Sequence, residues 1–226
     1  MKNQLLKLTA FLISATILFS CNTKKTTTNE MDHAMPDMAQ SDSINSDGMT
    51  PQGADHGMMQ AMGSSMDKMK DMKMTGQFDA DFASIMILHH QSAIDMSEAE
   101  VAKGNDAEAK AMAQRMITKQ KDEIASLQKF TKSNETPDAK MDHNDSQELT
   151  KAMESMMDKM NAMQMTGNAD KDFVMMMIPH HEGALTMAAH QVKHGKNAEL
   201  KKMAQTMITD QEKEIAELKA WQTSRN

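Results

Sequence analysis

Cysteine, tyrosine and other bulky aromatic residues are scarce in this chain. It contains one cysteine and no tyrosine, and aromatic residues make up 3% of the sequence. A single cysteine cannot form a disulfide within the chain, and it cannot supply the several thiolates that many zinc sites require. The missing apolar bulk is supplied by 29 methionines. Core packing alone rarely recruits so many.

Positive charge is also in short supply. The chain has 25 basic and 32 acidic residues, for a formal net charge of -7. Residues 1–20 contain two lysines and no acid, so the chain without this segment carries -9. An acidic protein without a basic stripe is a poor candidate for binding nucleic acid. We therefore expect no nucleic-acid partner.

Long apolar runs are missing after the N-terminal segment. Residues 1–20 combine two lysines with the apolar run Leu8–Phe19, which is shorter than the ~20 residues that span a bilayer and is typical of a signal peptide. The lone Cys21 follows directly, in a pattern that resembles a lipoprotein box. We expect an exported protein that faces the periplasm or the cell surface and meets the membrane only through a lipid on Cys21. Ordinary cleavage, with Cys21 left as a spare thiol, is the alternative.

Two parts of the sequence resemble each other at a constant offset of 91 residues. The stretch Phe82–Met96, which contains His89-His90, returns as Phe173–Met187, which contains His180-His181. No gap is needed to continue the match through both repeats. The pattern predicts an all-α protein built from two tandem three-helix repeats.

The repeats divide the chain into five segments. These are a lipoprotein signal peptide (1–20), a disordered tether with Met/His clusters (21–56), a first helical repeat (57–130), a linker (131–148) and a second helical repeat (149–226). We expect the long helices to pack into one antiparallel bundle over 57–226 with approximate two-fold symmetry, its ends or sides covered by the first helices. Two separate three-helix domains are the alternative.

Apolar spacing and stop signals predict the helices of each repeat. The expected ranges are 58–74, 79 or 81 to 103, and 106–130 in the first repeat, and 149–165, a matching second helix ending before Gly195, and 197–221 in the second. The first helices carry methionine stripes and are expected to end at Thr75-Gly76 and Thr166-Gly167. Pro179 is expected to kink the helix that contains it.

Histidine and methionine share faces of these helices. At helical periodicity Met86, His89 and Met96 point the same way, so the first histidine of the pair is expected inside and His90 at the rim. The second repeat matches this with Met177, His180, His181 and Met187, and adds His190 and His194, which have no counterpart in the first. The third helices present Met112, Met116, Met203 and Met207 inward, together with Glu123 and Glu214. A buried glutamate needs a partner, which can be a histidine, a metal-bound histidine, a lysine or a helix end.

Neutral thioethers combined with imidazoles suit soft metal ions, Cu(I) first and Ag(I) by the same argument. Methionine also binds without losing a proton. The candidate ligands are Met86, His89, His90, Met96, Met112, Met116, Met177, His180, His181, Met187, His190, His194, Met203 and Met207. Enzyme motifs are not complete: a zinc-protease pattern at His181-Glu182 lacks its second histidine, where Leu185 stands. We expect a binding protein without catalytic activity.

The motif Phe-x-x-x-Met-Ile-x-His-His-x-x-Ala-x-x-Met, present at Phe82–Met96 and Phe173–Met187, resembles the family named domain of unknown function 305. The motif Met-Ile-x-x-Gln-x-x-Glu-Ile at Met116–Ile124 and Met207–Ile215 resembles it too. The resemblance implies a ferritin-like helical bundle, export and a link to copper binding and tolerance. It also implies a role for His89, His90, His180, His181, Met86, Met96, Met177 and Met187.

These observations favour a lipid-anchored copper-binding protein that sequesters Cu(I) or passes it to a transfer partner. Two other interpretations stay open. The methionines could form a pliable surface for proteins or peptides, or they could scavenge oxidants as a methionine oxidation sink.

Overall fold

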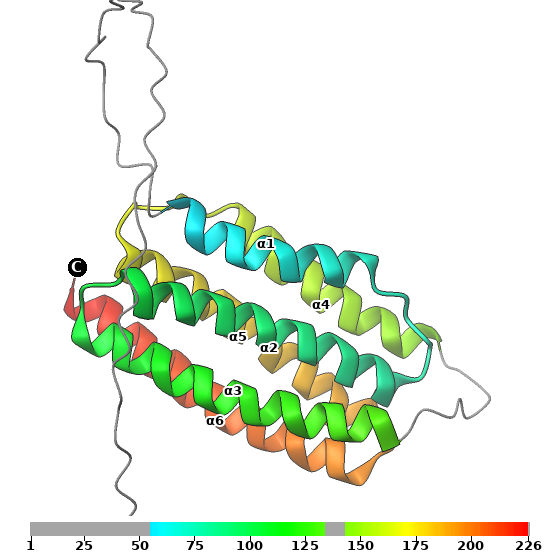
Figure 1. Ribbon diagram of the computed structural model, residues 1–226. Coiled ribbons are helices and arrows are strands. Elements are labelled where there is room, and N and C mark those ends of the chain that lie inside the picture. The colour runs from blue at the N-terminus through cyan, green and yellow to red at the C-terminus, as the bar shows by residue number, and fades with distance from the viewer. Residues whose placement is uncertain (1–54, 134–142, 226) are drawn as a thin grey trace, which may run out of the picture. The chain divides into compact units, whose positions relative to one another are not determined.

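The computed structural model describes residues 55–133 and 143–225 (Figure 1). Within these ranges the chain forms six α-helices and no strand. The helices are α1 (Asp55–Asp71), α2 (Phe78–Lys103), α3 (Ala107–Ser133), α4 (His143–Asn161), α5 (Ala169–His194) and α6 (Ala198–Ser224). The predicted all-α bundle is confirmed. The predicted signal peptide, Cys21 and nearly all of the predicted tether lie outside the described residues. Within the described residues, no helix is both long and apolar enough to cross a membrane.

The helices lie in three layers (Figure 1). α2 and α5 contact each other in the middle layer, α1 and α4 cover one side, and α3 and α6 cover the other. Each outer helix packs mainly on the long middle helix of its own repeat. Because both His-His pairs belong to α2 and α5, the fold places all four of these histidines in the middle layer.

Methionine dominates the core between the layers. Phe82 and Phe173 are fully buried at equivalent places in the two repeats, and methionine is the commonest residue of the surrounding core, with members on all six helices. α5 continues through the buried Pro179 as a single helix. The core is therefore rich in neutral sulfur, including on the two helices that carry the histidine pairs.

Several helix ends differ from the prediction. α1 and α4 stop at Asp71 and Asn161, before the expected ends, while α3 and α6 run three residues beyond theirs, and α4 begins inside the expected linker. Gly76 and Gly167 have positive φ angles of 77° and 78°, as a left-handed turn requires. They lie in the turn after the helix rather than at its cap.

Asp81 explains the early end of α1. One oxygen of its buried carboxylate accepts hydrogen bonds from the backbone N–H and the hydroxyl of Thr75, and the other accepts from the backbone N–H of Gly76 at 2.9 Å and the hydroxyl of Ser146 at 2.7 Å. The carboxylate thereby holds the turn that joins α1 to α2. Asp172 does the same for Thr166 and Gly167 in the second repeat.

Replacing Asp81 with Ala is expected to lower the free energy of unfolding by about 2 to 4 kcal/mol, because several hydrogen bonds to a buried charge are lost together. Urea unfolding monitored by circular dichroism measures the change. Asp67→Ala, which removes an exposed carboxylate from α1, is the matched control and is expected to shift stability by less than about 0.5 kcal/mol. Equal stabilities for the two variants would contradict this role of Asp81.

Each repeat also supplies an aspartate that accepts hydrogen bonds from the start of the third helix of the other repeat. Asp79 of the first repeat accepts hydrogen bonds from the backbone N–H groups of Lys196 and Asn197, just before α6. Asp170 of the second repeat accepts from the backbone N–H groups of Asn105 and Asp106, just before α3. The exchange is reciprocal, and all six helices form one compact unit.

Candidate metal centre

The two histidine pairs meet where α2 and α5 cross. The rings of His89 and His180, equivalent residues of the two repeats, lie with their centroids 3.8 Å apart. The Nε2 of His89 is 3.1 Å from the carbonyl oxygen of His180, and the Nε2 of His180 is 2.9 Å from the hydroxyl oxygen of Ser92. The approximate two-fold axis of the bundle therefore passes close to this histidine contact.

Ser92 and Gly183 make the contact asymmetric although they are equivalent in the repeats. A Cβ atom on Gly183 would lie 2.9 Å from the side chain of Met156, so the second repeat has no room for a side chain there. The residue of the first repeat that matches Met156 is the smaller Ser65. This leaves room for Ser92, whose hydroxyl contacts His180.

The second histidine of each pair contacts a glutamate on the third helix of its own repeat. His90 lies 2.8 Å from Glu123, and His181 lies 2.8 Å from Glu214, in each case between Nε2 and a carboxylate oxygen. The His181 contact also has hydrogen-bond geometry, whereas the His90 contact is close without that alignment. Of the partners that the sequence left open for these glutamates, the structure shows a histidine for both and, for Glu214, a lysine as well.

The expected position of His90 and His181 at the rim is wrong. Both side chains are 0% exposed. Periodicity along one helix places them at the flank of α2 and α5, but α3 and α6 pack over that flank and bring their carboxylates with them.

Glu214 receives a second partner across the bundle. Lys119 of α3 lies 3.2 Å from Glu214 and 3.2 Å from Asp210, both on α6. Burial opposes ionisation of Glu214, but the hydrogen bond from His181 and the charge of Lys119 outweigh it and hold the pKa of this carboxyl below its usual range. Glu214 is therefore a carboxylate at neutral pH and accepts a hydrogen bond from the Nε2–H of His181.

His89 and His180 stay neutral at physiological pH. Burial is the main cause that lowers the pKa of each imidazole well below 6.5, and the neighbouring histidines lower it further. A neutral imidazole keeps one nitrogen lone pair, which is the form that binds metal.

All four histidines leave the same atom without a partner. Nδ1 of His89, His90, His180 and His181 is buried and makes no hydrogen bond to any residue in the described ranges 55–133 and 143–225. A carbonyl or carboxylate can only accept, so Nε2 of His89 and of His181 carries the proton and Nδ1 carries the lone pair. A histidine whose outer N–H is held by a carbonyl or carboxylate, with its other nitrogen free, matches the usual arrangement of metal-binding histidines.

Thioethers are the donors available to complete such a site. Among the described residues, no group of three or more His, Cys, Asp or Glu side chains is arranged to hold a metal ion. Met86, Met96, Met177 and Met187 are fully buried on the histidine-bearing helices, and Met112, Met116 and Met207 are buried on α3 and α6. Met203 is only partly buried.

His190 and His194 lie apart from the four central histidines. Their rings stack 5.9 Å apart near the end of α5, and His194 also contacts Phe78 at 5.8 Å. Ten residues of helix separate His190 from His180, a distance of about 15 Å. The fold therefore does not bring this pair into the central site.

Comparisons with known proteins agree with the two-repeat architecture. The model of a family described as "Domain of unknown function (DUF305)" matches residues 21–131 and again residues 127–222. The chain belongs to the DUF305 family. The resemblance drawn from the histidine and glutamine motifs is thus confirmed. No curated protein matches this DUF305 chain.

Solved structures share its fold. The Cu(II)-bound form of CopM is 28% identical, with a TM-score of 0.50, and the match covers 66% of this DUF305 protein and 98% of the CopM chain. The Ag-bound form of CopM obtained by soaking is 28% identical, with a TM-score of 0.50 and coverage of 68% and 98%. A putative secreted DUF305 protein from Streptomyces coelicolor is 23% identical, with a TM-score of 0.50 and coverage of 64% and 91%.

Proposed function

We propose that this DUF305 protein is an envelope copper-binding protein that sequesters Cu(I) or hands it to another protein, and so contributes to copper tolerance. In this proposal the chain is exported and held at the membrane by a lipid on Cys21. It binds the metal without catalysing a reaction. The observation that supports it most is the set of four buried, unpartnered histidine Nδ1 atoms in a methionine-rich core.

The donor set favours Cu(I) over harder ions. Neutral imidazole and thioether ligands suit soft, low-charge cations, whereas calcium and magnesium need oxygen ligands. The similarity to CopM, whose structures include Cu(II)-bound and Ag-bound forms, supports copper or silver as the metal. The carboxylates of Glu123 and Glu214 orient two of the histidines and offset part of the charge that a bound ion brings.

We expect Cu(I) binding to weaken by at least about 100-fold when Ala replaces His89, His90, His180 and His181. The substitutions remove the nitrogen donors of the centre together with the hydrogen bonds that orient them. The measurement is a Cu(I) titration of the full chain against a competing chelator under reducing conditions. Circular dichroism shows whether the variant keeps its helices, and single substitutions replace the quadruple variant if it does not.

His190→Ala/His194→Ala is the matched control, since this pair lies about 15 Å along α5 from the centre. It is expected to keep the high-affinity Cu(I) site. Wild-type affinity in the variant without the four central histidines, or loss of the site in the control alone, would contradict the proposed centre.

A further inference from the structure

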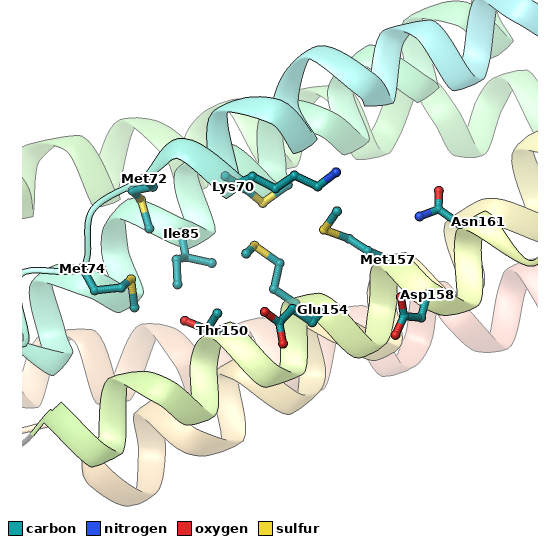
Figure 2. A pocket seen from close by; sticks show the side chains of 11 residues that line it. Lys70, Met72, Met74, Ile85, Thr150, Glu154, Met157, Asp158 and Asn161 are labelled. Carbon is teal, nitrogen blue, oxygen red and sulfur yellow. The ribbon is translucent and has the colours of Figure 1, made fainter.

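The space between α1 and α4 is lined with methionines (Figure 2). Each of these helices packs on the long helix of its own repeat and makes little contact with the other. A cavity of about 350 Å³ remains between them. Its methionines come from both repeats: Met69, Met72 and Met74 at the end of α1 and in the following turn, and Met153 and Met157 on α4.

These methionines border open space instead of filling it. Met69, Met153 and Met157 are between 2% and 6% exposed, and Met72 and Met74 are partly buried. Figure 2 shows Met72 and Met74 on one side of the cavity and Met157 on the other. A methionine recruited only for packing would be expected to close such a gap, because its unbranched side chain adapts to irregular space. Here five thioethers surround a volume that can take an ion.

The charged groups at the cavity favour a cation. Among the described residues, Glu154 and Asp158 of α4 and Lys70 of α1 are the charged residues that line it, which gives two carboxylates against one ammonium. All three side chains are exposed. An ion held by neutral thioethers keeps its full charge, so neighbouring carboxylates assist its capture.

We infer that this methionine cavity is a second soft-metal site, which takes Cu(I) or Ag(I) on thioether sulfur alone. The inference rests on the proposed copper function and adds a site that uses none of the histidines. No lining sulfur has to lose a proton before binding, so protons do not compete with the metal for the ligands of the cavity, and binding there is expected at pH 5 as well as at pH 7. Because the ligands come from α1 and its following turn in one repeat and from α4 in the other, a bound ion also links the two repeats.

The test is an Ag(I) titration of the full chain at pH 7 and pH 5, monitored by chelator competition. The test variant is Met72→Leu/Met74→Leu/Met153→Leu/Met157→Leu, since leucine preserves volume while removing sulfur. The matched control, Met59→Leu/Met175→Leu, removes two partly buried methionines that do not line the cavity. We expect the test variant to lose one equivalent of Ag(I) at both pH values, with the control unchanged.

The variant without the four central histidines separates this inference from the proposed function. It is expected to retain the cavity's equivalent at pH 5 and to lose it when the four leucine substitutions are added. If the histidine substitutions alone remove all Ag(I) binding and the leucine substitutions remove none, the central site stands and the cavity inference fails. If the wild-type chain binds neither Ag(I) nor Cu(I), both fail.

A measurement on the unaltered chain covers the case in which the leucine variant does not fold. With methionine methyl groups labelled with ¹³C, Ag(I) at pH 5 is expected to shift the NMR signals of Met72, Met74, Met153 and Met157. Single leucine substitutions assign these four signals. The inference would be overturned if Ag(I) shifted other methionine signals and left these four unchanged. It would also be overturned if an apolar peptide shifted these four signals and Ag(I) did not.

Discussion

Replacing Glu100 with Gln is expected to stabilise the protein by a few kcal/mol at pH 8. A pKa raised from 4.5 to about 8 corresponds to at most about 5 kcal/mol at about 1.4 kcal/mol per unit, and solvent screening lowers this contribution. Burial is the main cause that raises the pKa of Glu100 to about 8, followed by the hydrogen bond and the charge of Asp170. Asp106 raises it further and Lys110 opposes the shift. The buried carboxyl of α2 is therefore protonated at neutral pH.

The second repeat has an amide at the position of the Glu100 carboxyl. Gln191 is the equivalent of Glu100, and its Nε2 donates to Asp79, the equivalent of Asp170, at 2.6 Å. The amide supplies this donor at every pH. Glu100 supplies it to Asp170 only while it holds a proton.

The direction of the pH dependence follows from proton binding. The unfolded chain releases the Glu100 proton above about pH 4.5, whereas the folded chain keeps it up to about pH 8. Unfolding in this window releases a proton, so the free energy of unfolding falls as pH rises from 4.5 to 8 and this contribution is constant above that range. Glu100→Gln is expected to remove this slope.

Urea unfolding at pH 5 to 9 tests the prediction, with Gln191→Glu as the reciprocal variant. That substitution places a carboxyl beside Asp79 and is expected to add a second decline in stability over the same pH window. Parallel curves for the wild-type chain and Glu100→Gln would show that Glu100 is already ionised in the folded protein.

The sequence predicts a helix end well where that end depends on residues adjacent in the chain. Gly104 and Gly195 follow the last residues of α2 and α5 as expected. The ends of α1 and α4 could not be predicted in this way, because they depend on Asp81 and Asp172, which reach back from the next helix. Comparison of the repeats could have indicated Glu100, which stands where the other repeat has Gln191.

The sequence predicts which histidines form the centre, but it does not predict which nitrogen of each ring carries the proton. The spacing of His89 and His180 predicts that both point inward. Which nitrogen remains free depends on acceptors from other helices, such as the His180 carbonyl and Glu214. The methionine cavity was equally beyond the sequence, because stripes on α1 and α4 do not specify how far apart these helices lie.

Glu123→Gln/Glu214→Gln is expected to raise the dissociation constant for Cu(I) by about 10- to 100-fold, the usual cost of removing groups that orient metal ligands. Glutamine can still accept a hydrogen bond from Nε2 of His181 and occupy the same place beside His90. It lacks the negative charge that makes the imidazole a better donor and balances the bound cation. The two glutamates act as positioning residues, so the helices should persist and only metal affinity should fall.

Chelator competition gives the affinity, and thermal unfolding of the metal-free variants separates a positioning role from a structural one. Glu217→Gln is the matched control: it makes the same change on α6 one turn beyond Glu214, at a side chain that is 52% exposed and pairs with Arg115 at the surface. Exposed pairs contribute little, so this variant should bind Cu(I) like the wild type. Unchanged affinity in Glu123→Gln/Glu214→Gln would mean that the carboxylates hold only the fold, and that the Nδ1 atoms of His90 and His181 are not ligands.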